Sequence, residues 1–183
     1  MIEFDWFEED EEEDLSQTER VFLAHLRMRA RTWSCRPQNT ELVKPADGCP
    51  YWRAVLDVSV EVEPRDLCLL TVGVCFDGTS IRCSEVHNQS YHPRPDDRSR
   101  VEVVEATGTP QDLAEIAAEW FERILVRPVE RREWRSDGRL TYHYVFPDTG
   151  TGLLWGGDAG PERFHRPPER IIHARGQAAH PRD

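Results

Sequence analysis

Cysteine and histidine side chains follow one another closely in one stretch of the sequence, and these residue types bind zinc. The stretch holds Cys83, His87 and His92, and Asp96 or Asp97 would supply a fourth, oxygen ligand. The spacing matches no zinc-binding signature, and the strand pattern places Cys83 in the core. We therefore interpret the stretch as a core thiol followed by exposed loop histidines, and keep Cys83, His87 and His92 as the metal candidates.

Nucleophilic chemistry has weaker support from the sequence. Cys35 and Cys49 would react only as thiolates, which need a neighbouring base or a helix N-terminus, and the sequence signals neither. Adjacent acids such as Asp96-Asp97 point apart in a loop, and the glycine-rich stretch 150–160 lacks the Lys-Ser/Thr ending of a phosphate loop. The sequence therefore favours a protein that is not an enzyme and needs no cofactor.

Negative charge is concentrated at the start of the chain, in "MIEFDWFEEDEEED". Nine of these fourteen residues are acidic and none is basic, whereas residues 15–183 carry a net charge of only −2 of the total −11. Like charges at this density repel one another and keep a segment solvated. We predict that residues 1–14 form a mobile acidic N-terminal arm.

Aromatic residues among these acids suggest a recognition role for the arm. Long-range attraction would bring a basic partner close, and the rings would then be buried against it. The predicted partner-binding residues are Phe4, Trp6, Phe7, Glu8, Glu9, Asp10, Glu11, Glu12, Glu13 and Asp14. The alternative is an internal contact, in which the arm folds over basic residues of the chain itself. Those residues are Arg20, Arg27, Arg29 and Arg31, or the tail 163–175.

Two helices are predicted to position these groups. "SQTE" is a capping box in which Ser16 caps and Glu19 reaches back, and an apolar stripe at helical spacing runs on to Trp33. Thr109-Pro110 begins the second helix, whose wide apolar stripe continues to Leu125. Each helix is therefore expected to cover one face of a sheet.

A loop is predicted after Pro37, to about Pro50, and strands are predicted between this loop and the second helix. Residues 53–63 alternate between apolar and polar side chains, and residues 67–76 are almost entirely apolar. Asp77-Gly78 predicts a two-residue turn, which pairs Val74 with Ile81. One face of this hairpin is apolar, and we expect the opposite face to be solvated. Whether residues 101–107 form a further strand is left open.

A second hairpin is predicted at residues 129–146, and two registers are compatible with it. A two-residue turn would place Trp134 opposite Thr141, and a three-residue loop would place it opposite Leu140. We predict the three-residue loop, because it collects the aromatic side chains on one face.

These elements predict an α+β fold with the order α-β-β-β-(β)-α-β-β. One antiparallel sheet of five to six strands would have two helices packed on one face. Residues 15–147 would form a single domain, followed by an irregular Gly/Pro/Arg-rich tail at 148–183. The element order over residues 15–146 is similar to that of small acidic secretion chaperones, with which the chain shares no motif.

Composition narrows the function classes. The opening lacks the basic and apolar character of a secretory signal, no apolar run is long enough for a membrane, and the five cysteines include no Cys-x-x-Cys pair. These features predict a cytoplasmic protein, and the lack of a broad basic face argues against nucleic-acid binding. We predict a non-catalytic protein-binding module, chaperone-like or toxin-neutralising, that engages a basic partner protein.

Other readings stay open from the sequence. One alternative is a metal-dependent enzyme or regulator that uses the loop around His87 and His92. Another is a structural subunit that docks through the aromatic hairpin 129–146. A homo-oligomer is compatible with each reading.

Overall fold

The computed structural model describes residues 5–8, 14–45, 51–62, 65–87, 90–136, 138–157 and 164–175. Two helices and nine strands lie in these ranges. In chain order they are α1 (Gln17–Ala30), β1 (Thr40–Val43), β2 (Trp52–Val62), β3 (Arg65–Phe76), β4 (Ser80–Val86), β5 (Val104–Thr107), α2 (Pro110–Val126), β6 (Val129–Ser136), β7 (Arg139–Phe146), β8 (Thr151–Gly157) and β9 (Arg170–Arg175). Short 3₁₀ helices occupy Pro37–Asn39 and Asp96–Arg98.

The predicted α+β class is confirmed. All strand pairs with a described register are antiparallel, and the strands form a five-stranded sheet, β1-β2-β3-β4-β5, and a four-stranded sheet, β8-β7-β6-β9. The last predicted hairpin thus belongs to a sheet of its own. β1 lies in a stretch that we expected to be a loop, and β5 settles that a strand exists within residues 101–107.

Contacts divide the chain into two units. Unit 1 comprises Met1–Val58 and Thr71–Leu125, and unit 2 comprises Ser59–Leu70 and Val126–Asp183. Each unit is therefore a compact body in its own right.

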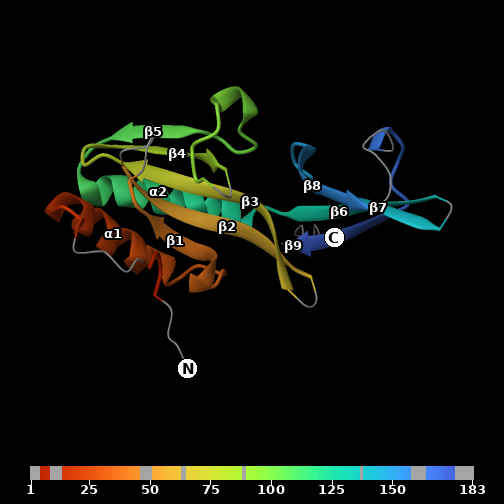
Figure 1. The fold of residues 1–183 in the computed structure, drawn as a ribbon, viewed down its shortest axis with the longest axis horizontal. Helices are drawn as coiled ribbons and strands as arrows, with labels where there is room; N and C mark the ends of the chain where they lie inside the picture. The colour runs from red at the N-terminus through yellow and green to blue at the C-terminus, as the bar shows by residue number, and fades with distance from the viewer. Residues whose placement is uncertain are drawn as a thin grey trace, which may run out of the picture. The chain divides into compact units, whose positions relative to one another are not determined.

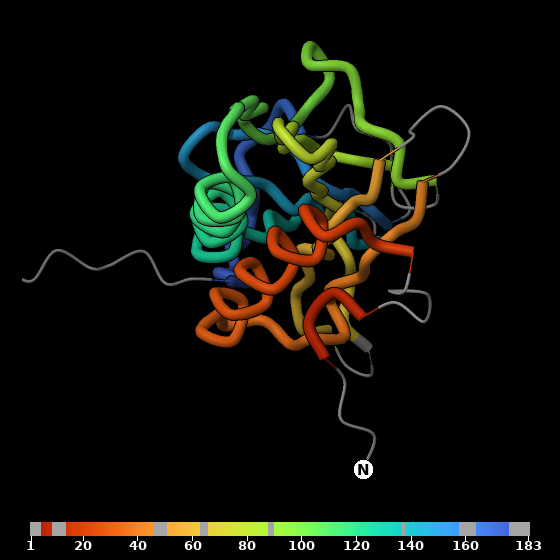
Figure 2. Tube along the Cα trace, turned by 90° about the vertical axis from the view of Figure 1, so that its left-hand side faces the viewer, coloured from red at the N-terminus to blue at the C-terminus, as the bar shows by residue number. Residues whose placement is uncertain are grey.

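In unit 1 the two helices lie beside each other on one side of the five-stranded sheet (Figures 1 and 2). The predicted capping box begins α1: the Glu19 N–H donates to Ser16 Oγ, and the Ser16 N–H donates to Glu19 Oε2 at 2.7 Å. Phe22 of α1 stacks on Phe76 of β3 with ring centroids 4.3 Å apart. The apolar stripes thus cover the sheet as the sequence predicts.

The opposite face of this sheet is also buried, so our expectation of a solvated face is wrong. Thr71, Ser84 and Arg53 are each 1% exposed. The segment 90–95 lies beside the sheet here, because Val86 pairs with Pro93. Glu85 lies opposite Val72 and so belongs to the helix-covered face. It is completely buried and forms ion pairs with Arg94 at 2.8 Å and Arg100 at 2.5 Å. This buried carboxylate fastens the segment after β4 to the sheet.

The β3–β4 hairpin keeps the predicted faces but not the predicted pairing. Val74 lies opposite Cys83, and Phe76 lies opposite Ile81, so the pairing is shifted by two residues. The Asp77 carboxylate accepts hydrogen bonds from the backbone N–H groups and hydroxyls of Thr79 and Ser80, which moves the turn one residue along the chain. These bonds, led by that from the Ser80 hydroxyl, lower the pKa of Asp77 to about 2.

In unit 2 the β6–β7 hairpin (Figure 1) adopts the register that we did not choose. Trp134 lies opposite Thr141, so the predicted three-residue loop is wrong. The prediction placed all aromatic side chains on one face, whereas the sheet uses both. Trp134 packs against Phe164 and donates to the Arg166 carbonyl, while Arg131 lies over the Tyr142 ring.

The region predicted as an irregular tail contains β8 and β9, so that prediction is wrong for these residues. β8 contains three glycines, which are rare in strands, whereas β9 is a short strand with two isoleucines between its terminal arginines. A Cβ atom at Gly156 would lie 2.6 Å from the Tyr142 hydroxyl, and one at Gly152 would lie 2.5 Å from the His143 ring. The glycines therefore make room for large side chains of the neighbouring strand.

Candidate functional site

Two aromatic side chains of the acidic opening segment are part of the core of unit 1. Trp6 is 8% exposed and Phe7 is fully buried. The Trp33 ring lies 5.6 Å from that of Trp6 and 6.0 Å from that of Phe7, and Phe121 of α2 lies 5.9 Å from Phe7. The burial of these rings stabilises the docked segment, since each aromatic side chain removes a large apolar area from water.

The main chain of the same segment is held by polar contacts. Arg27 donates from Nε to the Trp6 carbonyl at 2.8 Å and from Nη2 to the Phe7 carbonyl at 2.9 Å. The Phe7 N–H donates to Thr40 Oγ1 at 2.9 Å, and the Leu42 N–H donates to the Glu8 carbonyl at 3.4 Å. Phe7 has a φ of 52°, a left-handed conformation that is strained for a bulky residue. The surrounding contacts therefore fix an unfavourable backbone geometry.

This placement changes the interpretation of the predicted partner-binding residues. Trp6 and Phe7 have almost no exposed surface with which to contact a partner. They fit the alternative in which the arm folds over basic residues of the chain itself, and Arg27 is one of the basic residues predicted for that contact. Glu8 and Asp14 are exposed. Phe4, Glu9, Asp10, Glu11, Glu12 and Glu13 lie outside the described residues.

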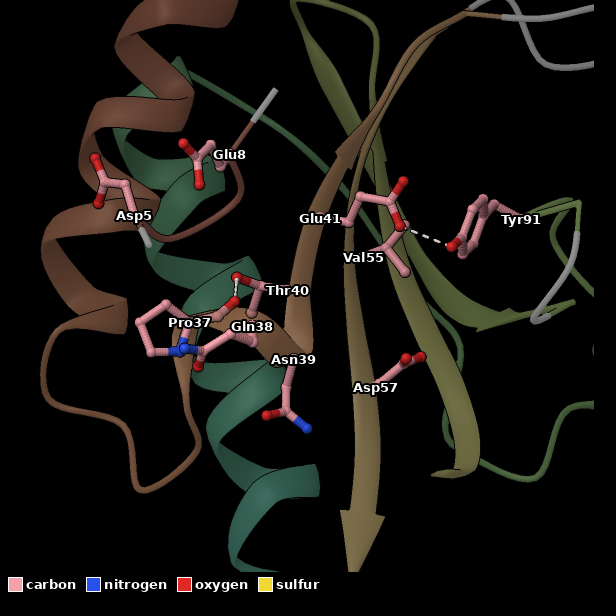
Figure 3. A pocket seen from close by; sticks show the side chains of 10 residues that line it. All are labelled: Asp5, Glu8, Pro37, Gln38, Asn39, Thr40, Glu41, Val55, Asp57 and Tyr91. Carbon is pink, nitrogen blue, oxygen red and sulfur yellow. Dashed lines mark hydrogen bonds between the residues drawn. The ribbon is translucent and has the colours of Figure 1, made fainter. Parts of the chain in front are cut away.

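An open pocket of about 230 Å³ lies in unit 1 next to the docked segment (Figure 3). Among the described residues, its lining includes four acidic residues and no basic one. The lining residues are Asp5, Glu8, Pro37, Gln38, Asn39, Thr40, Glu41, Val55, Asp57 and Tyr91. The pocket is therefore a region of negative potential that favours a positively charged group.

Neutral donors orient the carboxylates of the pocket without cancelling their charge. The Tyr91 hydroxyl donates to Glu41 Oε2 at 2.7 Å, as Figure 3 shows, and the Thr71 hydroxyl donates to Asp57 Oδ1 at 2.7 Å. The Trp6 N–H donates to Asp5 Oδ1 at 2.8 Å. Each of these three carboxylates has a second oxygen to which no described residue donates a hydrogen bond. The Glu8 carboxylate receives no such bond at either oxygen.

Elsewhere in unit 1, arginines neutralise many of the acids. Arg29 pairs with Glu115 and Glu122 across the two helices, and Arg82 pairs with Asp96 and Glu105. Within the described ranges, no such ion pair reaches the pocket carboxylates. The pocket carboxylates are therefore oriented negative charges that form no ion pair with a described residue.

A buried arginine positions Tyr91 at the pocket. Arg53 donates from Nη1 to the Tyr91 carbonyl at 2.8 Å and from Nη2 to the Lys44 carbonyl at 3.3 Å. Tyr91 has a φ of 52°, so its backbone is in the left-handed region. Because a buried guanidinium holds its carbonyl, this strained conformation is maintained and the hydroxyl is directed to Glu41.

The metal candidates are not brought together. Cys83 is fully buried in β4, and burial raises the pKa of its thiol to about 12, which disfavours the thiolate that metal binding requires. His87 is exposed and His92 is half-buried, and they are linked through main-chain atoms only, from the His87 N–H to the His92 carbonyl. In the part of the chain that the structure describes, no three His, Cys, Asp or Glu side chains could hold a metal ion.

The other chemical candidates are placed as follows. Cys35 is half-buried after α1, and Cys49 lies outside the described residues. Asp96 pairs with Arg82, and Asp97 is exposed. In the glycine-rich stretch, residues 151–157 form β8.

Sequence reasoning missed most of the pocket. Glu41 lies on β1, which we expected to be a loop, and Asp57 was predicted only as one of several polar residues of an alternating strand. The register places Glu41 opposite Val55, so Glu41 and Asp57 share one face in diagonal positions. If residues 40–43 had been predicted to form a strand, Glu41 and Asp57 could have been placed on the same face of the sheet.

No protein-family model matches this chain, and no similar protein was found among curated proteins or solved structures. Among the described residues, no helix combines the length and apolar character needed to cross a membrane.

Proposed function

We propose that the protein is a non-catalytic binding module whose unit 1 engages a basic segment of a partner protein. The pocket carries this proposal, because four carboxylates line it and no basic side chain does. The charge distribution supports it as well. Unit 2 contains eleven basic and eleven acidic residues, so the formal net charge of −11 belongs entirely to unit 1.

An arginine side chain matches the pocket best. Glu41 and Asp57 occupy diagonal positions of neighbouring strands, and such residues are typically about 7–8 Å apart, with slightly closer Cβ atoms. A planar guanidinium with five donors can bridge two carboxylates at such a spacing, whereas an ammonium group acts as a point charge. The hydroxyls of Tyr91 and Thr71 hold both carboxylates in place beforehand, which lowers the entropic cost of binding.

A chaperone-like or toxin-neutralising role in the cytoplasm accords with such a site. Both roles require a protein that covers a basic partner without altering it. The five cysteines of the sequence include no Cys-x-x-Cys pair, a composition that suits a reducing compartment. Attraction between the acidic unit and a basic partner would speed association and weaken as the salt concentration rises.

Titration of the protein with a labelled hexa-arginine peptide tests this proposal. We expect the double variant Glu41→Gln/Asp57→Asn to bind the peptide at least tenfold more weakly than the wild type. The matched control is Asp97→Asn/Glu119→Gln, which removes two exposed acids of unit 1 outside the pocket and should change affinity less than twofold. Equal losses in the two variants would show that net charge alone attracts the peptide, and the pocket proposal would be rejected.

A further inference from the structure

The docked segment Asp5–Glu8 has the features of a bound peptide. Its two rings enter a groove formed by Trp33 and Phe121, and its main chain is held by Arg27, Thr40 and Leu42. Four hydrogen bonds join its main chain to these residues. The groove therefore recognises the segment chiefly through backbone atoms and aromatic rings.

The charges of the segment do not suit their surroundings. The carboxylates of Asp5 and Glu8 line the same pocket as those of Glu41 and Asp57 (Figure 3). Like charges that share a pocket repel one another, and no basic side chain lies in the lining to offset them. The segment thus has the right shape for the groove but the wrong charge for the adjacent pocket.

We propose that a partner segment with two adjacent aromatic residues, flanked by arginine or lysine, displaces Asp5–Glu8 from this groove. The inference rests on the proposed function and specifies the partner's chemistry. The partner's rings would replace Trp6 and Phe7, and its basic residues would lie where Asp5 and Glu8 now lie. Attraction to Glu41 and Asp57 would then replace repulsion.

The main-chain contacts make this exchange sterically reasonable. Arg27 donates to carbonyl oxygens, and Thr40 accepts from a backbone N–H, so both would bind any segment with the same backbone path. The rings select for aromatic residues, because the space of Phe7 is enclosed completely. Recognition by backbone and by side-chain pockets in combination is a common way for proteins to bind peptides.

Because Asp5–Glu8 belongs to the same chain as the groove, it competes with the partner segment for that groove. A segment attached by a short linker has a high effective concentration at its groove, so the partner's apparent affinity is lowered by the fraction of grooves that are occupied internally. Weakening the internal contact should therefore strengthen partner binding. This direction distinguishes displacement from a purely structural role of Trp6 and Phe7.

The test uses the full-length protein and three labelled peptides. The first has the sequence of residues 3–9, and the second has arginine in place of its four acids. The third is the second with alanine in place of the Trp6 and Phe7 counterparts. Fluorescence anisotropy measures affinity, and hydrogen exchange of the Phe7 amide, which is bonded to Thr40, measures displacement.

We expect the arginine peptide to bind at least tenfold more tightly than either other peptide and to speed exchange of the Phe7 amide. We also expect the full-length Phe7→Ala variant to bind it at least fivefold more tightly than the wild type. If Phe7→Ala does not fold, Trp6→Leu, which keeps an apolar side chain, should also bind the arginine peptide more tightly than the wild type.

Three outcomes would overturn the inference in different ways. If the arginine peptide binds while the Phe7 amide stays protected, displacement is rejected and the acidic pocket remains supported. If the alanine-containing peptide binds equally well, the aromatic groove plays no part in recognition. If no peptide binds, both this inference and the proposed function are rejected.

Discussion

Unit 1 and unit 2 contain similar numbers of basic residues but use their acids differently. Unit 2 has eleven acids for eleven bases, and Glu130, Glu133 and Asp148 each pair with an arginine. Unit 1 has 23 acids for 12 bases, and the surplus includes the four carboxylates of the pocket. Among the described residues, the paired acids stabilise their unit, whereas the pocket carboxylates keep open oxygens, as the proposed binding of a basic segment requires.

The largest effect is expected where a paired acid of unit 1 is neutralised. Glu85→Gln should lower the free energy of unfolding by about 3 kcal/mol, because Arg94 and Arg100 lose a buried partner. Urea unfolding followed by circular dichroism measures this loss. The matched variant in unit 2 is Glu133→Gln, whose partner Arg131 also lies over the Tyr142 ring, so it should cost less. A loss below about 1 kcal/mol for Glu85→Gln would show that this ion pair is not what fastens the segment after β4.

Removing the negative charges of the pocket should change binding strongly and stability little, unlike the loss of stability expected for Glu85→Gln. Glu41→Gln/Asp57→Asn is expected to leave stability unchanged or slightly higher, since it removes like charges that pair with no base among the described residues. The same variant should lose about 1.4 kcal/mol of binding free energy for a basic peptide, which corresponds to the tenfold loss of affinity. Thermal unfolding and peptide titration of the same sample measure both quantities. A large loss of stability would mean that the two carboxylates are structural.

In unit 2, lowering the pH is expected to reduce the free energy of unfolding by less than about 1 kcal/mol. Burial, with a smaller contribution from Arg132, lowers the pKa of His143, so the unfolded chain takes up the proton more readily than the folded one. The contribution to stability is therefore present above the ordinary histidine pKa of about 6.5 and is lost as the pH falls below it. Urea unfolding at pH 8 and pH 5 measures it, and His143→Gln should flatten the difference. An unchanged difference in that variant would assign the effect to other groups.

The smallest effect is expected at the β3–β4 turn in unit 1. Hydrogen bonds from Ser80 and Thr79 lower the pKa of Asp77 to about 2, so the folded carboxylate stays charged where the unfolded one takes up a proton. The resulting stability is present above about pH 4 and is lost as the pH falls towards 2. Because Asp77 is exposed, the effect should stay below about 0.5 kcal/mol. Comparing acid unfolding of the wild type with that of Asp77→Asn tests it, and identical profiles would contradict the assignment.

The sequence was sufficient for features that depend on neighbouring residues. The capping box at Ser16, the cap at Thr109 and the apolar stripes of α1 and α2 need only local spacing, and the structure has them. The faces of β3 and β4 were also predictable, since the side-chain period of a strand is fixed. Their pairing was not, because the Asp77 side chain determines where the turn lies.

Features that depend on distant residues were missed. The glycines of β8 are unfavourable in a strand by themselves, but Tyr142 and His143 of the neighbouring strand occupy the space above Gly156 and Gly152. β9 pairs with β6, which is distant in the sequence. The burial of Phe7 follows from Trp33 and Phe121, not from the charges around it. The pocket requires the β1–β2 register, which no local pattern signals.

The most direct test compares the affinities of the two charge-matched variants for the hexa-arginine peptide at low salt. Both variants have two fewer negative charges than the wild type, so only the position of the lost charges differs. The account predicts that Glu41→Gln/Asp57→Asn binds at least five times more weakly than Asp97→Asn/Glu119→Gln. Indistinguishable affinities would contradict it, because the pocket would then be no better than the rest of the acidic surface.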